Sequence, residues 1–201
     1  MKKLIIILSI LILVACSVFA GDMHLVRVST IVETQNPSFV LKAGLDPDSF
    51  DRTVSDEEAT SILGWEIVEK SIKSEDVVVY FEVVQKGLAR KVGDKYSLSI
   101  EASEMVLSYK EDGSVLDSDS KTYKTTKGKI SDITPFSSER AIVAITGVNA
   151  TTRDIATIVA EYNGMVEDGT PIAKFTVTWP KDIDAPDGIY QASVILKVSQ
   201  Q

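Results

Sequence analysis

The strongest constraint on the fold of this chain is the alternation of apolar and polar residues along most of its length after residue 20. Successive side chains of a β-strand point to opposite faces of a sheet, so a period of two residues predicts strands with one buried face. β-Branched and aromatic residues fill many of the apolar positions, as is typical of strands. The pattern predicts ten strands, at residues 25–32, 38–44, 63–69, 77–85, 96–107, 121–130, 141–148, 155–162, 172–179 and 189–198.

Turn-forming residues separate these segments, and Asp112-Gly113 predicts a tight hairpin. One stretch favours a helix: Ser55 followed by Glu58 forms a capping box, and Gly64 would end the helix within about two turns. Many short strands separated by turns indicate a sandwich or a barrel. We therefore expect an all-β protein with an antiparallel immunoglobulin-like or pilin-like β-sandwich of about ten strands and one short helix.

Residues 1–20 have the composition of an export signal. Lys2 and Lys3 precede an apolar run at residues 4–15, which is too short to span a bilayer permanently. Val18 and Ala20 are the small residues that a signal peptidase requires, so cleavage would leave residues 21–201. We expect these residues to form one sandwich domain, with two smaller sandwiches divided near residues 111–129 as the alternative.

The same N-terminal region permits a second kind of processing at Cys16, the only cysteine of the chain. Residues 13–16, Leu-Val-Ala-Cys, match a bacterial lipobox, in which the cysteine is lipidated and becomes the first residue. Ordinary cleavage yields a soluble chain, whereas lipidation at Cys16 is the one route that would attach it to a membrane. Both alternatives place the protein outside the cytoplasm, in the periplasm, the outer envelope or at the cell surface.

The charge of the chain disfavours one class of partner. It has 29 acidic and 21 basic residues, and removal of residues 1–20 takes away two lysines and no acid, so the mature net charge is about −10. An acidic surface repels phosphate backbones. We expect no nucleic-acid partner.

Few residues suit enzymatic chemistry. His24 is the only histidine, and ordinary cleavage leaves no cysteine, so neither a serine-histidine triad nor a multi-histidine metal site can be assembled. The glycines form no phosphate-binding or dinucleotide motif, and we expect no cofactor and no metal. A hydrolase that uses two carboxylates distant in sequence stays an alternative.

Three acidic clusters have the oxygen ligands that calcium prefers, but none has the spacing of a known calcium loop. Because aspartate is common in turns for local reasons, we expect turn residues here. The clusters are Asp46, Asp48 and Asp51; Asp117 and Asp119; and Asp182, Asp184 and Asp187.

The aromatic residues of the predicted strands are a core or, alternatively, a platform on which a sugar stacks. We expect them in the core, where aromatic residues of strands usually lie. They are Trp65, Tyr80, Phe81, Phe175, Trp179 and Tyr190.

The C-terminal segment carries the most regular alternation of the chain. One face of residues 188–198 holds Tyr190, Ala192, Val194, Leu196 and Val198, after Trp179-Pro180 and a turn at residues 185–188. This segment resembles the final strand of spore-coat-U-like and pilin-type bacterial surface β-sandwiches. The resemblance implies assembly by strand donation, in which the N-terminal strand of one subunit completes the sandwich of the next. The residues suited to such a donor strand are Val26, Val28, Thr30 and Val32.

These observations predict a non-enzymatic structural or interaction protein, exported to the bacterial envelope or surface, that binds protein partners or assembles with itself. A pilin-like subunit is the sharper form of this hypothesis. The alternatives are a module, lipid-anchored or soluble, that binds a glycan or a protein through its loops, and the carboxylate-based hydrolase.

Overall fold

A computed structural model of the protein describes residues 25–33, 39–50, 63–69, 72–87, 91–109, 114 and 122–201. The predicted helix near Ser55 and the hairpin at Asp112-Gly113 lie outside these residues. In the described part, no helix is long and apolar enough to cross a membrane. The strands are β1 (Leu25–Glu33), β2 (Phe39–Gly44), β3 (Leu63–Glu69), β4 (Val77–Gln85), β5 (Lys95–Ala102), β6 (Glu104–Tyr109), β7 (Lys124–Lys127), β8 (Lys129–Pro135), β9 (Ala141–Val148), β10 (Ile155–Tyr162), β11 (Pro171–Trp179) and β12 (Ile189–Gln200).

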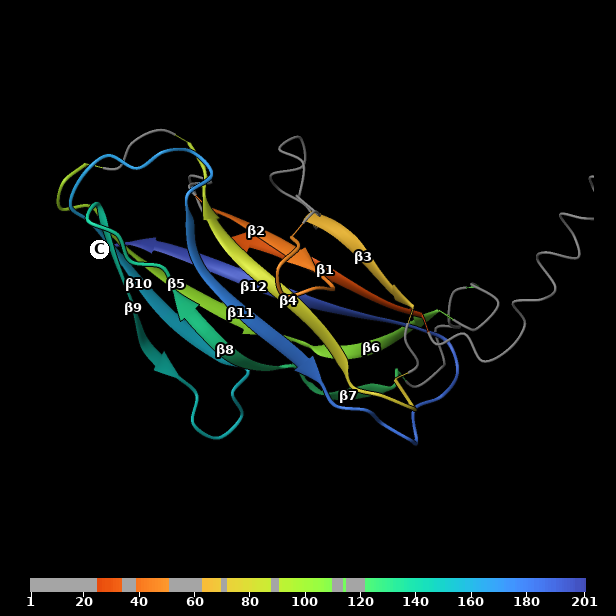
Figure 1. Ribbon diagram of the computed structural model, residues 1–201. Coiled ribbons are helices and arrows are strands. Elements are labelled where there is room, and N and C mark those ends of the chain that lie inside the picture. The colour runs from red at the N-terminus through yellow and green to blue at the C-terminus, as the bar shows by residue number, and fades with distance from the viewer. Residues whose placement is uncertain are drawn as a thin grey trace, which may run out of the picture.

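These strands form two sheets, and the prediction of a β-sandwich is confirmed. The larger sheet has the order β3-β1-β12-β5-β10-β9, and β6 and β7 extend it beside β12. The smaller sheet has the order β2-β4-β11-β8, and Figure 1 shows it lying across the larger one. Strands that precede residues 111–129 and strands that follow them occur in both sheets, and their buried residues form one core.

One pair of strands departs from the antiparallel arrangement that we expected. β1 lies between β12 and β3, antiparallel to β3 but parallel to β12. Parallel pairing requires a long connection between the paired strands. The whole sandwich lies between β1 and β12 in the sequence, so this requirement is met, and β1 continues into β2 of the opposite sheet.

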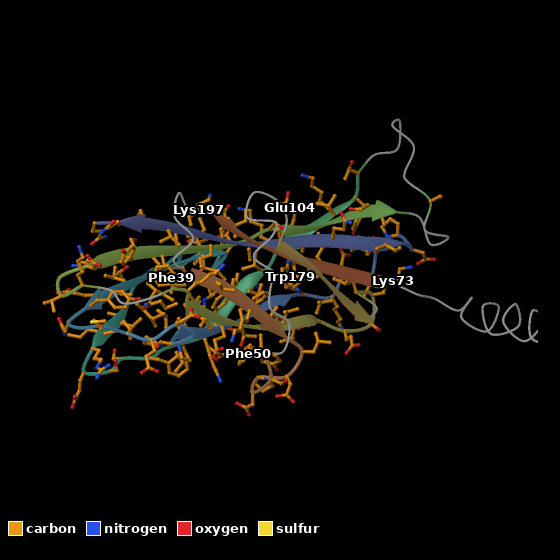
Figure 2. All side chains as sticks on the ribbon, turned by 90° about the horizontal axis from the view of Figure 1, so that it is seen from above. Phe39, Phe50, Lys73, Glu104, Trp179 and Lys197 are labelled. Atoms are coloured by element: carbon orange, nitrogen blue, oxygen red, sulfur yellow. The ribbon has the colours of Figure 1, made fainter. Side chains whose placement is uncertain are left out.

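The alternating pattern places one face of each sheet in the core. Along β11, Phe175, Val177 and Trp179 are buried, whereas the residues between them are half-buried on the outer face. Figure 2 shows Phe39 and Trp179 between the two sheets, while Lys197 and Phe50 lie outside on opposite sides. Burial of this apolar surface is the main stabilising contribution in a fold without disulfides.

Two of the predicted strands are each divided in two, and both divisions lie at Trp179. The predicted strand 96–107 divides at Ser103, whose carbonyl oxygen accepts hydrogen bonds from Trp179 Nε1 (2.8 Å) and from the Gly128 amide (3.1 Å). The predicted strand 121–130 divides at Gly128, where an added Cβ would lie 2.7 Å from the Trp179 ring. The indole group therefore sets where both strands break.

Candidate functional site

A hollow of about 430 Å³ that carries charged side chains lies on the outer face of the smaller sheet. It lies beside the C-terminal part of β4 and the N-terminal part of β11, and the segment that joins β8 to β9 forms its wall. We call it the outer groove. Its lining residues are Glu82, Phe136, Ser137, Ser138, Ala141, Thr170, Pro171 and Lys174.

Lys174 is the only charged residue of β11, and the strand's alternation turns it away from the core. Its Nζ atom lies 4.8 Å from the ring centroid of Phe50 and 5.9 Å from that of Phe136. A cation within about 6 Å of an aromatic ring is attracted by the electrons of the ring face. The two rings thus hold the ammonium group at the groove, and no described carboxylate forms an ion pair with it.

A tight turn after β2 brings Phe50 to this position. The Asp48 amide donates to Asp46 Oδ1 (2.9 Å), and the Ser49 amide donates to the Asp46 carbonyl oxygen (3.2 Å). The turn folds back so closely that a Cβ at Gly44 would lie 1.9 Å from the Ser49 carbonyl oxygen. Glycine at position 44 is therefore required for the turn that carries Phe50.

Glu82 is the acidic residue of the outer groove. In the β-ladders it lies directly opposite Lys174 on one side and Lys42 on the other. Opposite charges at such positions commonly pair. Within the described part of the chain, however, the Glu82 carboxylate has no ion pair or hydrogen bond. The groove consequently holds a carboxylate and an ammonium group that do not form an ion pair with each other.

The two serines of the groove wall are engaged with the edge of β9. Ser137 Oγ accepts from the Val143 amide (2.9 Å) and donates to the Val143 carbonyl oxygen (3.0 Å), and Ser138 Oγ accepts from the Ala141 amide (3.2 Å). Both side chains satisfy backbone groups that an edge strand would otherwise leave unpaired. They fix the wall against β9.

The acidic clusters do not converge on a common point. Asp182 accepts from the Tyr123 hydroxyl (2.6 Å) and from the Asp184 amide (3.2 Å), and Asp187 forms an ion pair with Lys73 (2.5 Å). Asp46 accepts hydrogen bonds from the amides of its own turn. The other acidic residues of these clusters, Asp51, Asp117 and Asp119, lie outside the described residues. Among the residues that the structure places, no group of three or more acids, histidines or cysteines is close enough to hold a metal ion.

Two tyrosines tie the loop between β11 and β12 to the sandwich. The hydrogen bond to Asp182 raises the pKa of Tyr123 to about 12, and burial raises the pKa of Tyr190 well above its ordinary value. The Tyr190 hydroxyl donates to the Pro186 carbonyl oxygen (2.6 Å). Both phenols are thus protonated donors at neutral pH, with a structural role.

A buried carboxylate joins the turn between β9 and β10 to β7. Asp154 is 4% exposed, forms an ion pair with Lys127 (2.8 Å) and accepts a hydrogen bond from the Thr152 hydroxyl. These two donors stabilise the ionised form, so the pKa of Asp154 lies below its ordinary value.

This lowered pKa predicts a loss of stability in acid. A carboxyl whose pKa is lowered by folding stabilises the folded state above its unfolded pKa of about 3.9, and this contribution disappears as the pH falls through the folded pKa. We expect Asp154→Asn to lower the free energy of unfolding by about 1–3 kcal/mol near neutral pH. The difference from the wild type should shrink when urea denaturation is repeated at about pH 3.

A matched control for this experiment is Glu161→Gln, which removes a solvent-exposed ion pair with Lys95 (3.7 Å). Exposed pairs contribute little, so its effect should be small at both pH values. A difference for Asp154→Asn that does not change with pH would contradict the assignment.

The residues that sequence alternation placed on one face of the last strand lie in the core. Tyr190, Ala192, Val194 and Leu196 are buried, and Val198 is half-buried against the core. In β1, Val26 and Val28 are buried, and Thr30 and Val32 are the register partners of Val194 and Leu196.

The core prediction for the aromatic residues is confirmed at four described positions and is wrong at Tyr80. Phe81, Phe175, Trp179 and Tyr190 are buried, whereas Tyr80 is half-buried on the outer face of the smaller sheet. The side chain of Trp65 is outside the description, as are Cys16 and His24.

The structure also reveals an apolar surface that we did not predict. β8 and β9 are edge strands of the two sheets and contact each other. There Ile145 is 42% exposed and Val148 is 40% exposed, and Ile133 of β8 is half-buried against the core. We call these three residues the β8–β9 side. The sequence signal for it was the absence of any charge in residues 141–148.

Comparison of the chain with models of known protein families and with curated proteins finds no match. The resemblance of residues 188–198 to spore-coat-U-like and pilin-type proteins therefore stays a prediction.

Proposed function

We propose that the chain is a non-enzymatic structural or interaction protein, exported to the bacterial envelope or surface, that acts by assembly with further copies of itself. Export is supported by the composition of residues 1–20, with cleavage before Gly21 or lipidation at Cys16 as its two forms. Assembly is supported by the β8–β9 side, where apolar side chains of the inner sheet faces reach solvent.

The exposure of Ile145 and Val148 is the observation that carries this proposal. Their register partners in β10 are Ile158 and Ala156, whose side chains are buried in the core. Ile145 and Val148 are on the same face of the sheet but remain 42% and 40% exposed. A partner that covers them would gain about 25 cal/mol of favourable free energy for each Å² of apolar surface removed from water.

The edge strands β8 and β9 have features that hinder the pairing of an additional strand from another molecule. Ser137 occupies both outward backbone groups of Val143, and the β9–β10 ladder shifts register at Thr146. In β8, Asp132 has a positive φ of 51° at an irregularity of the ladder with β11. Such bulges interrupt the pairing of edge strands. Side chains of the β8–β9 side, and not a continuous backbone ladder, are therefore the proposed contact.

A second copy of the chain is a partner that the uncharged β9 permits. The mature chain has a net charge of about −10, so two copies repel each other over most of their surface. Residues 141–148 contain no charged side chain, which removes this repulsion where β9 of one copy meets β9 of another. An isologous contact of this kind gives a closed dimer.

Sedimentation velocity of the purified mature chain over a range of concentrations tests this contact. We expect a reversible dimer, and we expect Ile145→Lys with Val148→Lys to weaken it at least about tenfold, because the four introduced ammonium groups would face each other at a buried contact. The control is Ile183→Lys, which alters an equally apolar residue that is 73% exposed in the loop between β11 and β12. A wild type that is monomeric throughout, or a double variant that dimerises equally well, would refute the proposal.

Pilin-like strand donation is the second form of assembly that one observation favours. β1 pairs in its sheet with β12 and β3 and not with β2, the strand that follows it in the chain. The same ladders would form if β1 came from another copy. Deletion of residues 22–32 tests this possibility.

A further inference from the structure

The outer groove holds two opposite charges that the protein itself leaves unused. Lys174 and Glu82 face each other across the β4–β11 ladder, yet they form no ion pair. The ammonium group of Lys174 instead lies between the rings of Phe50 and Phe136. This arrangement keeps the Glu82 carboxylate available to a ligand.

The remaining lining of the groove is suited to an apolar ligand body. Phe136, Ala141 and Pro171 supply carbon atoms, and the hydroxyls of Ser137 and Ser138 are engaged with β9. The volume of about 430 Å³ is within the range of pockets that bind small molecules. Apolar walls with a few placed polar groups are the usual composition of such sites.

We propose that the outer groove binds a short zwitterionic peptide. Its carboxylate pairs with Lys174, its ammonium group pairs with Glu82, and its side chains contact Phe136 and Pro171. A ligand that is only an anion would meet the Glu82 carboxylate, and a ligand that is only a cation would meet the Lys174 ammonium group. A molecule with both charges satisfies both residues, so charge complementarity selects this class.

The Phe50 turn gives the site its rigidity. Because Gly44 allows the turn at residues 45–50 to fold against β2, the Phe50 ring restrains Lys174 before any ligand arrives. A restrained side chain loses less conformational entropy on binding.

Trialanine at neutral pH is the probe, and its binding is followed by NMR chemical shifts of the ¹⁵N-labelled mature chain. Three analogues separate the charges: N-acetyl-trialanine keeps the carboxylate alone, trialanine amide keeps the ammonium group alone, and N-acetyl-trialanine amide has neither. We expect shifts at the groove with trialanine at millimolar concentrations and an affinity about tenfold lower for each singly charged analogue.

Variants of the protein provide the matching half of the experiment. Lys174→Gln and Glu82→Gln should each weaken trialanine binding about tenfold, while Lys174→Arg should retain it. The control is Lys42→Gln, since Lys42 flanks Glu82 in the ladder but does not line the groove. Absence of binding, equal binding of the uncharged analogue, or unchanged affinity in both Gln variants would overturn the proposal.

Discussion

A chain that lacks residues 22–32 should fail to form the native sandwich. The deletion removes most of β1, which pairs with β12 over eight register positions and with β3 on its other side. It also removes the buried side chains of Val26 and Val28, each of which contributes about 1.5–3 kcal/mol when fully buried. Because domains of this size are stable by about 5–15 kcal/mol, these losses and those of two ladders should abolish cooperative unfolding in circular dichroism.

A synthetic peptide of residues 22–33 added in trans provides the control, because it restores the missing strand without restoring the covalent link. We expect it to recover part of the folded signal. The pilin-like form of assembly predicts a different outcome: the shortened chain would stay folded, would no longer polymerise and would bind the same peptide in an open groove. A deletion variant that is folded and monomeric and does not bind the peptide would contradict both hypotheses, that β1 completes its own sheet and that it is donated to another copy.

Leu196→Ala should be among the most destabilising single substitutions in the chain. Leu196 is fully buried in β12, between Val32 of β1 and Ile100 of β5 in the register of the larger sheet. Truncation removes apolar contacts and leaves a cavity, which costs about 2–5 kcal/mol. Urea denaturation measured by tryptophan fluorescence gives the change in the free energy of unfolding.

Lys197→Ala is the matched control one residue further along the same strand. Its side chain points outward, where Lys197 Nζ lies 3.1 Å from Glu101 Oε2 at the solvent-exposed surface. Exposed pairs contribute about 0–1 kcal/mol, so this variant should unfold almost as the wild type does. Equal losses at positions 196 and 197 would mean that β12 does not bury one face only.

Four strands were predicted with the bounds that the structure shows, and alternation was the signal for each. The bounds of β3, β4, β9 and β10 agree with the predicted ranges residue for residue. Here the pattern suffices because burial of one face is a local property of a two-residue repeat. The same reasoning placed Tyr190, Val194 and Leu196 in the core.

The site residues were not predicted, because their role arises from contacts between distant segments. The sequence analysis did not single out Lys174, and nothing near it in the sequence points to Phe50 or Phe136. Their rings reach Lys174 through two turns that follow different strands. A pairing of this kind depends on sheet order, which alternation does not specify.

The sequence by itself determined the all-β class, most strand positions and the buried face of β12, since side-chain polarity and a period of two residues are enough for that. Only the tertiary structure decided that β1 runs parallel to β12, that Ser103 and Gly128 interrupt two strands at Trp179, and that Ile145 and Val148 stay exposed. Each of these depends on which strand or ring lies next to which in space. Alternation is the same for every pairing partner, so it cannot choose among them.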